Sequence, residues 1–160
     1  MSPTTHLHQP EQQCIFCRIA MGLDPCHKVW EDAHYLAFLS IFPNTEGFTV
    51  VIPKQHLSSY VFDHPETEVN KLMAAARQVA NRLVKKFETA ARVALLFEGY
   101  GVNHLHAKLI PLHGTNTADW QKHTSCISTK FTQYPGYVSS HDAERVSDKT
   151  LAALARRLRE

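Results

Sequence analysis

Residues 103–114 (NHLHAKLIPLHG) constrain the fold of this 160-residue chain more than any other stretch. Nitrogen-bearing side chains alternate there with apolar ones. The first group is His104, His106 and Lys108, and the second is Leu105, Ala107 and Leu109. Because successive side chains of a strand point to opposite faces, the pattern predicts a strand with one apolar face and one titratable face. Ordinary half-exposed strand residues are the alternative, but so many titratable groups on one face favour a functional site.

The rest of the chain predicts an α+β fold. Residues 65–87 place apolar side chains at the i, i+3, i+4 and i+7 positions of a one-faced helix. Short runs rich in β-branched and aromatic residues, bounded by turn residues, predict about five antiparallel strands including residues 103–114. The other predicted strands are residues 27–32, 35–42, 47–53 and 92–97. A turn at residues 98–101 makes the last two strands a hairpin.

Three parts are expected along the chain. Residues 1–13 are polar and are predicted to be a disordered tail. Residues 14–113 form the folded domain, which begins with a short helix at residues 14–21. Residues 114–160 are a C-terminal extension in which a long loop precedes a helix capped by Ser147. The loop is interpreted as a lid, part of a dimer interface or a disordered strap.

Composition excludes several classes of protein. A hydrophobic content of 44%, a charged content of 20% and a net charge of +2 are ordinary for a globular domain and indicate neither nucleic acid nor membrane as partner. The basic residues of the long helix read as its solvated side, so RNA is the weaker interpretation. They are Arg77, Arg82, Lys85 and Lys86. Without a basic segment followed by an apolar run at the N-terminus, we expect a cytoplasmic protein.

Cys14 and Cys17 have the spacing at which two thiolates reach one metal ion. No second pair of this kind follows, so further ligands would be distant histidines, for which His56 and His104 are the candidates. Two reduced cysteines that pack a short helix are an equal alternative on spacing alone.

His106 is the central member of the alternating row. A neutral imidazole attacks phosphorus when a hydrogen bond holds its other nitrogen, because this fixes the tautomer and raises nucleophilicity. A neighbouring cation such as Lys108 stabilises charge that develops on phosphate oxygens or on the leaving group.

Three segments in this order resemble the histidine triad (HIT) family of nucleotide-binding hydrolases and transferases. They are CIFCRIA, VWEDAHYLAFLSIFPNTEGFTVVIPKQH and HLHAKLIP. The resemblance implies a HIT-like α+β domain, commonly paired as a homodimer. It makes His106 look like the nucleophile that forms a nucleotidyl-histidine, and His104 like the first histidine of the triad. In bacterial members with the cysteine pair it implies a structural zinc ion, which maps to Cys14, Cys17, His56 and His104.

The chain departs from the family pattern at three places. Lys108 occupies the third triad position, giving an H-x-H-x-K variant, and Ser40 stands where the family has the aspartate that binds the ribose hydroxyls. The loop at residues 98–103 lacks the usual Gly-Gln-Ser run, which leaves Asn103 and the backbone at Gly101 as substitutes.

Two functions are therefore predicted. The first is a nucleotidyl hydrolase or transferase acting on a nucleoside phosphate derivative, either a dinucleoside polyphosphate or a phosphoramidate. The alternative is a non-catalytic module that binds a nucleotide or a protein partner on the same scaffold.

Overall fold

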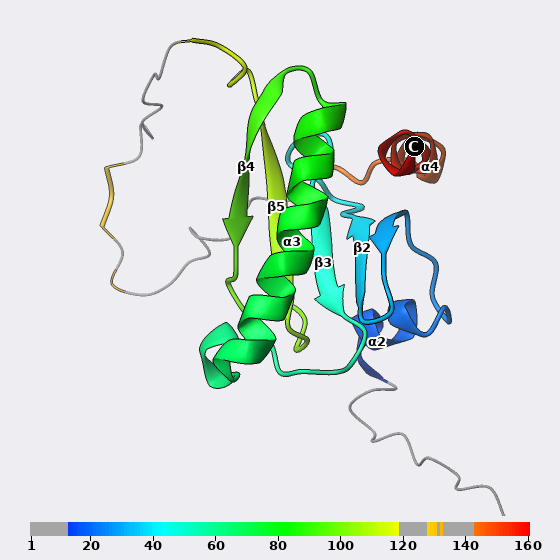
Figure 1. Ribbon diagram of the computed structural model, residues 1–160, viewed down its shortest axis with the longest axis vertical. Coiled ribbons are helices and arrows are strands. Elements are labelled where there is room, and N and C mark those ends of the chain that lie inside the picture. Colours follow the sequence, from blue (N-terminus) through cyan, green and yellow to red (C-terminus); the bar gives the residue numbers. More distant parts are fainter. Residues whose placement is uncertain (1–12, 119–127, 131, 133–142) are drawn as a thin grey trace, which may run out of the picture.

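The computed structural model describes residues 13–118, 128–130, 132 and 143–160 (Figure 1). Within them, five strands form one antiparallel sheet in the order β1-β2-β3-β5-β4. The strands are β1 (Lys28–Glu31), β2 (Tyr35–Leu39), β3 (Thr49–Pro53), β4 (Ala90–Leu96) and β5 (Ala107–His113). The predicted α+β fold with a five-stranded antiparallel sheet is confirmed.

Strand β5 lies inside the sheet, between β3 and β4. Lys108 is opposite Val50 of β3 and opposite Leu96 of β4. A side chain on β5 therefore has neighbours from two strands that are far apart in the sequence.

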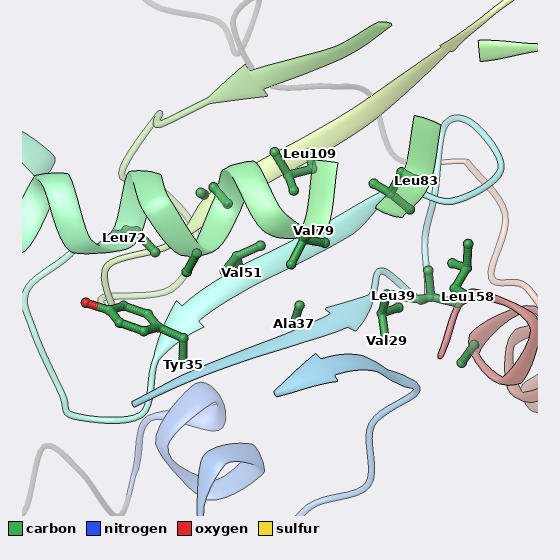
Figure 2. Close-up of a cluster of buried hydrophobic side chains, with 14 of the residues drawn as sticks. Val29, Tyr35, Ala37, Leu39, Val51, Leu72, Val79, Leu83, Leu109 and Leu158 are labelled. Atoms are coloured by element: carbon green, nitrogen blue, oxygen red, sulfur yellow. The ribbon is translucent and has the colours of Figure 1, made fainter. Parts of the chain in front are cut away.

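Helix α3 (Glu66–Lys86) crosses one face of the sheet (Figure 1). It buries Leu72, Val79 and Leu83 against Val51 and Leu109 in the main hydrophobic core (Figure 2). The predicted apolar half of the row belongs to this core, in which Leu105, Ala107 and Leu109 are at most 1% exposed.

Helix α4 (Asp148–Arg159) belongs to the same core as α3. Its buried residues are Leu151, Leu154, Ala155 and Leu158. Ser147 caps it as predicted, with its side-chain oxygen accepting a hydrogen bond from the backbone N–H of Thr150 at 3.2 Å. Arg82 of α3 donates to the carbonyl oxygens of Leu158 and Arg159, which joins the two helices.

Helix α2 (Ile15–Ala20) packs on the other face of the sheet. Its Phe16 and Ile19 pack on a second apolar cluster, formed by Leu36, Phe38, Val50 and Ile52. Since Val50 and Lys108 are opposite each other, the titratable half of the row also lies on the α2 face.

The titratable row differs from the prediction in one respect. The strand begins at Ala107, so His104 and His106 precede it. The backbone N–H of Leu105 donates to the carbonyl of Leu57 at 2.8 Å, and that of His104 donates to Val102 at 2.8 Å. The backbone is thus held by the segment after β3 and by a tight local turn, instead of by a neighbouring strand.

The predicted disordered tail, apart from residue 13, and most of the predicted long loop fall outside the described residues. None of the helices in the described part of the chain has the length and apolar character needed to cross a membrane.

Candidate active site and metal centre

Four predicted metal ligands come together at one end of the sheet. They are Cys14 and Cys17 from the start of α2, His56 from the segment after β3, and His104 from the segment before β5. Their ligand atoms all lie within 4.8 Å of one another. The Sγ atom of Cys17 is 3.2 Å from Nδ1 of His56 and 3.4 Å from Nδ1 of His104. The Sγ atom of Cys14 is 3.5 Å from the same His104 nitrogen.

These distances fit a tetrahedral zinc ion. With Zn–S and Zn–N bonds of about 2.3 and 2.0 Å, sulfur and nitrogen ligands lie roughly 3.5 Å apart across a tetrahedral edge. The other ring nitrogen of His104, Nε2, donates to the carbonyl of Pro53 at 2.8 Å, which leaves the Nδ1 lone pair directed at the thiols. Burial lowers the pKa of His104 to about 4, so its ring is neutral near pH 7, as a metal ligand must be.

His106 is held in one tautomer by the backbone. Its Nδ1 donates to the carbonyl oxygen of His104 at 2.7 Å, and the ring of Phe16 meets it edge-on with centroids 5.4 Å apart. The Nε2 atom therefore carries the lone pair. Burial is the main cause that lowers the pKa of His106, which keeps the imidazole neutral at physiological pH.

His106 lines a cavity of about 670 Å³ between α2, the sheet and the β4–β5 connection. Much of its wall is apolar and comes from Ile15, Phe16, Ile19, Phe38, Phe48 and Val50. The polar lining residues include Ser40, Tyr100, Glu98 and Lys108. An apolar wall with a few convergent polar groups is typical of a small-molecule site. A larger depression of about 1080 Å³, between the β2–β3 connection and α4, contains neither His104 nor His106.

The predicted substrate-binding residues divide into two groups. Ser40 and Gly101 line the cavity with His106. Asn103 is exposed, is not among the lining residues, and accepts a hydrogen bond on Oδ1 from the backbone N–H of Ser59 at 3.1 Å. His104 also does not line the cavity, because its ring is turned toward the cysteines.

Glu98 is the site residue that the sequence analysis missed. Its Oε1 accepts a hydrogen bond from Nζ of Lys108, and the two side chains are 5% and 16% exposed. The register of the β4–β5 hairpin could have revealed Glu98. Leu96 lies opposite Lys108, so Glu98, two residues after Leu96, lies on the same face of the sheet, beside His106.

A comparison with protein families identifies the family of this chain. The model of the HIT domain matches residues 22–115. The chain belongs to the HIT domain family. This match begins after Cys14 and Cys17, so the case for a metal centre depends on the geometry of the four ligands and not on the family match.

Individual relatives agree with this assignment. Protein hit of Bacillus subtilis is 34% identical over 119 residues, which are 70% of this chain and 81% of that protein. The adenosine 5'-monophosphoramidase hnt1 of Schizosaccharomyces pombe is 31% identical over 102 residues, or 61% of this chain and 73% of that protein. A zinc-bound histidine triad family protein from Mycobacterium smegmatis superposes with a TM-score of 0.63 at 22% identity, covering 93% of this chain and 92% of that one. At this identity the last comparison shows the shared fold alone.

Proposed function

We propose that this HIT-domain protein is a nucleotidyl hydrolase or transferase that acts on a nucleoside phosphate derivative through a covalent intermediate on His106. The observation that carries the proposal is the orientation of His106. Its Nδ1 is fixed by the His104 carbonyl, and its ring lines a cavity with an apolar wall that suits a nucleoside.

The reaction has two steps. In the first, Nε2 of His106 attacks the α-phosphorus, a P–N bond forms, and the bond from phosphorus to the leaving group breaks with its electron pair leaving on that group, which takes a proton from solvent when it departs as an amine. In the second, water or another hydroxyl acceptor attacks phosphorus and loses its proton to solvent, the P–N bond breaks, and His106 regains its lone pair. Lys108 lines the cavity, and the N–H donors of its ammonium that Glu98 does not bind can donate to the charge that develops on phosphate or leaving group.

The substrate is a phosphoramidate or a dinucleoside polyphosphate. The name of the Schizosaccharomyces pombe relative, an adenosine 5'-monophosphoramidase, supports the first of these classes.

We further propose that the four-ligand cluster binds a structural zinc ion. The three sulfur–nitrogen distances of 3.2, 3.4 and 3.5 Å in the cluster support this, and a fold neighbour, the Mycobacterium smegmatis protein, is described as zinc-bound. When bound, zinc cross-links α2 to the segment that carries His106. A homodimer and a cytoplasmic location are the family expectation.

The experiment is to trap the intermediate. The purified protein is mixed with adenosine 5'-phosphoramidate or diadenosine tetraphosphate, quenched in acid-free denaturant, and analysed by intact mass and peptide mapping. An adenylate on His106 that disappears in His106→Ala supports the proposal. Absence of both adduct and turnover with every nucleotide tested, in protein shown to contain zinc, contradicts it.

The second candidate is a non-catalytic nucleotide-binding or partner-binding module. The ion pair of Lys108 with Glu98 favours this function, because Glu98 binds the ammonium that would otherwise assist the leaving group. Calorimetric nucleotide binding that survives His106→Ala, with no chemistry in the parent protein, distinguishes this function from the first.

A further inference from the structure

The charge balance of the cavity is set by one ion pair. Among the cavity-lining residues that the structure describes, Lys108 is the only lysine or arginine. Its ammonium is bound by the carboxylate of Glu98, and both side chains are largely shielded from water. Because shielding from water strengthens the interaction of opposite charges, the cavity wall carries no free positive charge next to His106.

The second oxygen of Glu98 adds to this effect. Within the described part of the chain, the buried Oε2 atom of Glu98 has no hydrogen-bond partner. An ionised carboxylate only accepts hydrogen bonds, so phosphate oxygens, which are also acceptors, cannot satisfy it. A group that brings several negative charges close to Glu98 is repelled, and a group with a hydroxyl or N–H donor is not.

We propose that Glu98 is a specificity-determining residue of the His106 cavity. It neutralises Lys108, so that the cavity favours a nucleotide whose reacting phosphate carries a single charge and has no charged neighbour. The cavity disfavours a chain of charged phosphates. This inference rests on the proposed function, since it assumes that the cavity holds the nucleotide, but it concerns selectivity rather than chemistry.

The test compares two ligands in the His106→Ala background, in which no turnover disturbs binding. Dissociation constants are measured by calorimetry for adenosine 5'-phosphoramidate, which is singly charged, and for diadenosine tetraphosphate. The His106→Ala protein with Glu98 intact is expected to bind the phosphoramidate more tightly than the tetraphosphate. Adding Glu98→Gln frees the charge of Lys108 and is expected to tighten tetraphosphate binding about tenfold, with phosphoramidate binding changed less than about threefold.

Two control variants separate charge from structure. Glu98→Asp keeps the negative charge and is expected to keep the preference. Glu46→Gln removes an exposed glutamate that pairs with Arg157 outside this cavity, and it is expected to leave both dissociation constants unchanged. A preference that changes less than about twofold in Glu98→Gln, or that changes equally in Glu46→Gln, overturns the inference.

A measurement without a Glu98 variant covers the case in which Glu98→Gln does not fold. Tetraphosphate binding to the His106→Ala protein is followed from low to high salt. A neutralised cavity predicts a weak dependence, and a steep loss of affinity with salt overturns the inference, as does failure of both ligands to bind. An adduct on His106 without a shift in preference refutes only the role of Glu98, and a shift without an adduct refutes only the proposed chemistry.

Discussion

The carbonyl oxygen of His104 accepts a hydrogen bond from Nδ1 of His106 at 2.7 Å, while the His104 ring lies among Cys14, Cys17 and His56. One residue thus belongs to the proposed metal centre through its side chain and orients the proposed nucleophile through its backbone. Any movement of the His104 backbone changes the direction of the His106 lone pair. This hydrogen bond links the two sites, although of the two histidines only His106 lines the cavity.

Removal of the metal is therefore expected to affect both stability and the site. Cys17→Ser is predicted to abolish stoichiometric zinc binding, measured by mass spectrometry of the native protein, and to lower the melting temperature by roughly 5 °C or more. Cys26→Ser is the matched control, because Cys26 is a free thiol outside the four-ligand cluster. Zinc content that is unchanged in Cys17→Ser would show that the cluster is not the metal site.

The largely buried ion pair of Lys108 with Glu98 predicts a large energetic coupling. Lys108→Met leaves the Glu98 carboxylate buried and uncompensated, so the free energy of unfolding is expected to fall by about 3 kcal/mol. Adding Glu98→Gln to Lys108→Met is expected to restore part of this loss, because the lone charge is removed. Urea unfolding measures the complete cycle.

The exposed pair of Lys28 with Glu31 provides the control for this cycle. Lys28→Met is expected to change the free energy of unfolding by less than about 1 kcal/mol, since both side chains are accessible to water. Equal effects of Lys28→Met and Lys108→Met would contradict the burial of the Lys108 pair.

The helices, the strands and their antiparallel arrangement were predicted from the sequence, whereas the full strand order and the packing of α4 were not. The predicted helix at residues 65–87 differs by one residue at each end from α3, because its periodicity is a property of neighbouring residues. The position of β5 beside β3 depends on pairs such as Thr49 with Leu109, which no local pattern contains. The packing of α4 in the main core is long-range in the same way.

The same distinction applies to the site. His106 stood out because alternation is visible in the sequence. The four candidate metal ligands were named from the spacing of the cysteines and from the two distant histidines, and the resemblance to a family implied that they form one zinc site. Glu98 was missed because its role depends on a cross-strand register with Lys108. That Asn103 binds the substrate stays a prediction. In the structure its Oδ1 accepts a hydrogen bond from the backbone N–H of Ser59, a contact between residues 44 positions apart in the sequence.

Helix α4 is predicted to unfold together with the rest of the domain in one cooperative transition. Leu158→Ala removes a side chain that is 0% exposed in the main core, and the free energy of unfolding is expected to fall by about 2–5 kcal/mol. Leu23→Ala is the control, since Leu23 is 61% exposed and its loss is expected to cost less than about 0.5 kcal/mol. A separate, low-stability unfolding transition in Leu158→Ala would instead make α4 an independent extension.

Gly47 lies against Phe87, the residue that follows α3, and Gly22 is the control for a substitution at Gly47. Both have positive φ angles, of 85° and 73°, so an alanine is conformationally strained at either position. At Gly47 an added Cβ would lie 2.4 Å from Cε2 of Phe87, whereas at Gly22 nothing lies within 4 Å. The strain is common to both variants, so Gly47→Ala is expected to lose about 1–3 kcal/mol more than Gly22→Ala in urea unfolding. Equal losses in the free energy of unfolding would mean that the Phe87 ring moves away from the added Cβ at no energetic cost. The contact between Gly47 and Phe87 would then not help to hold the ring in place.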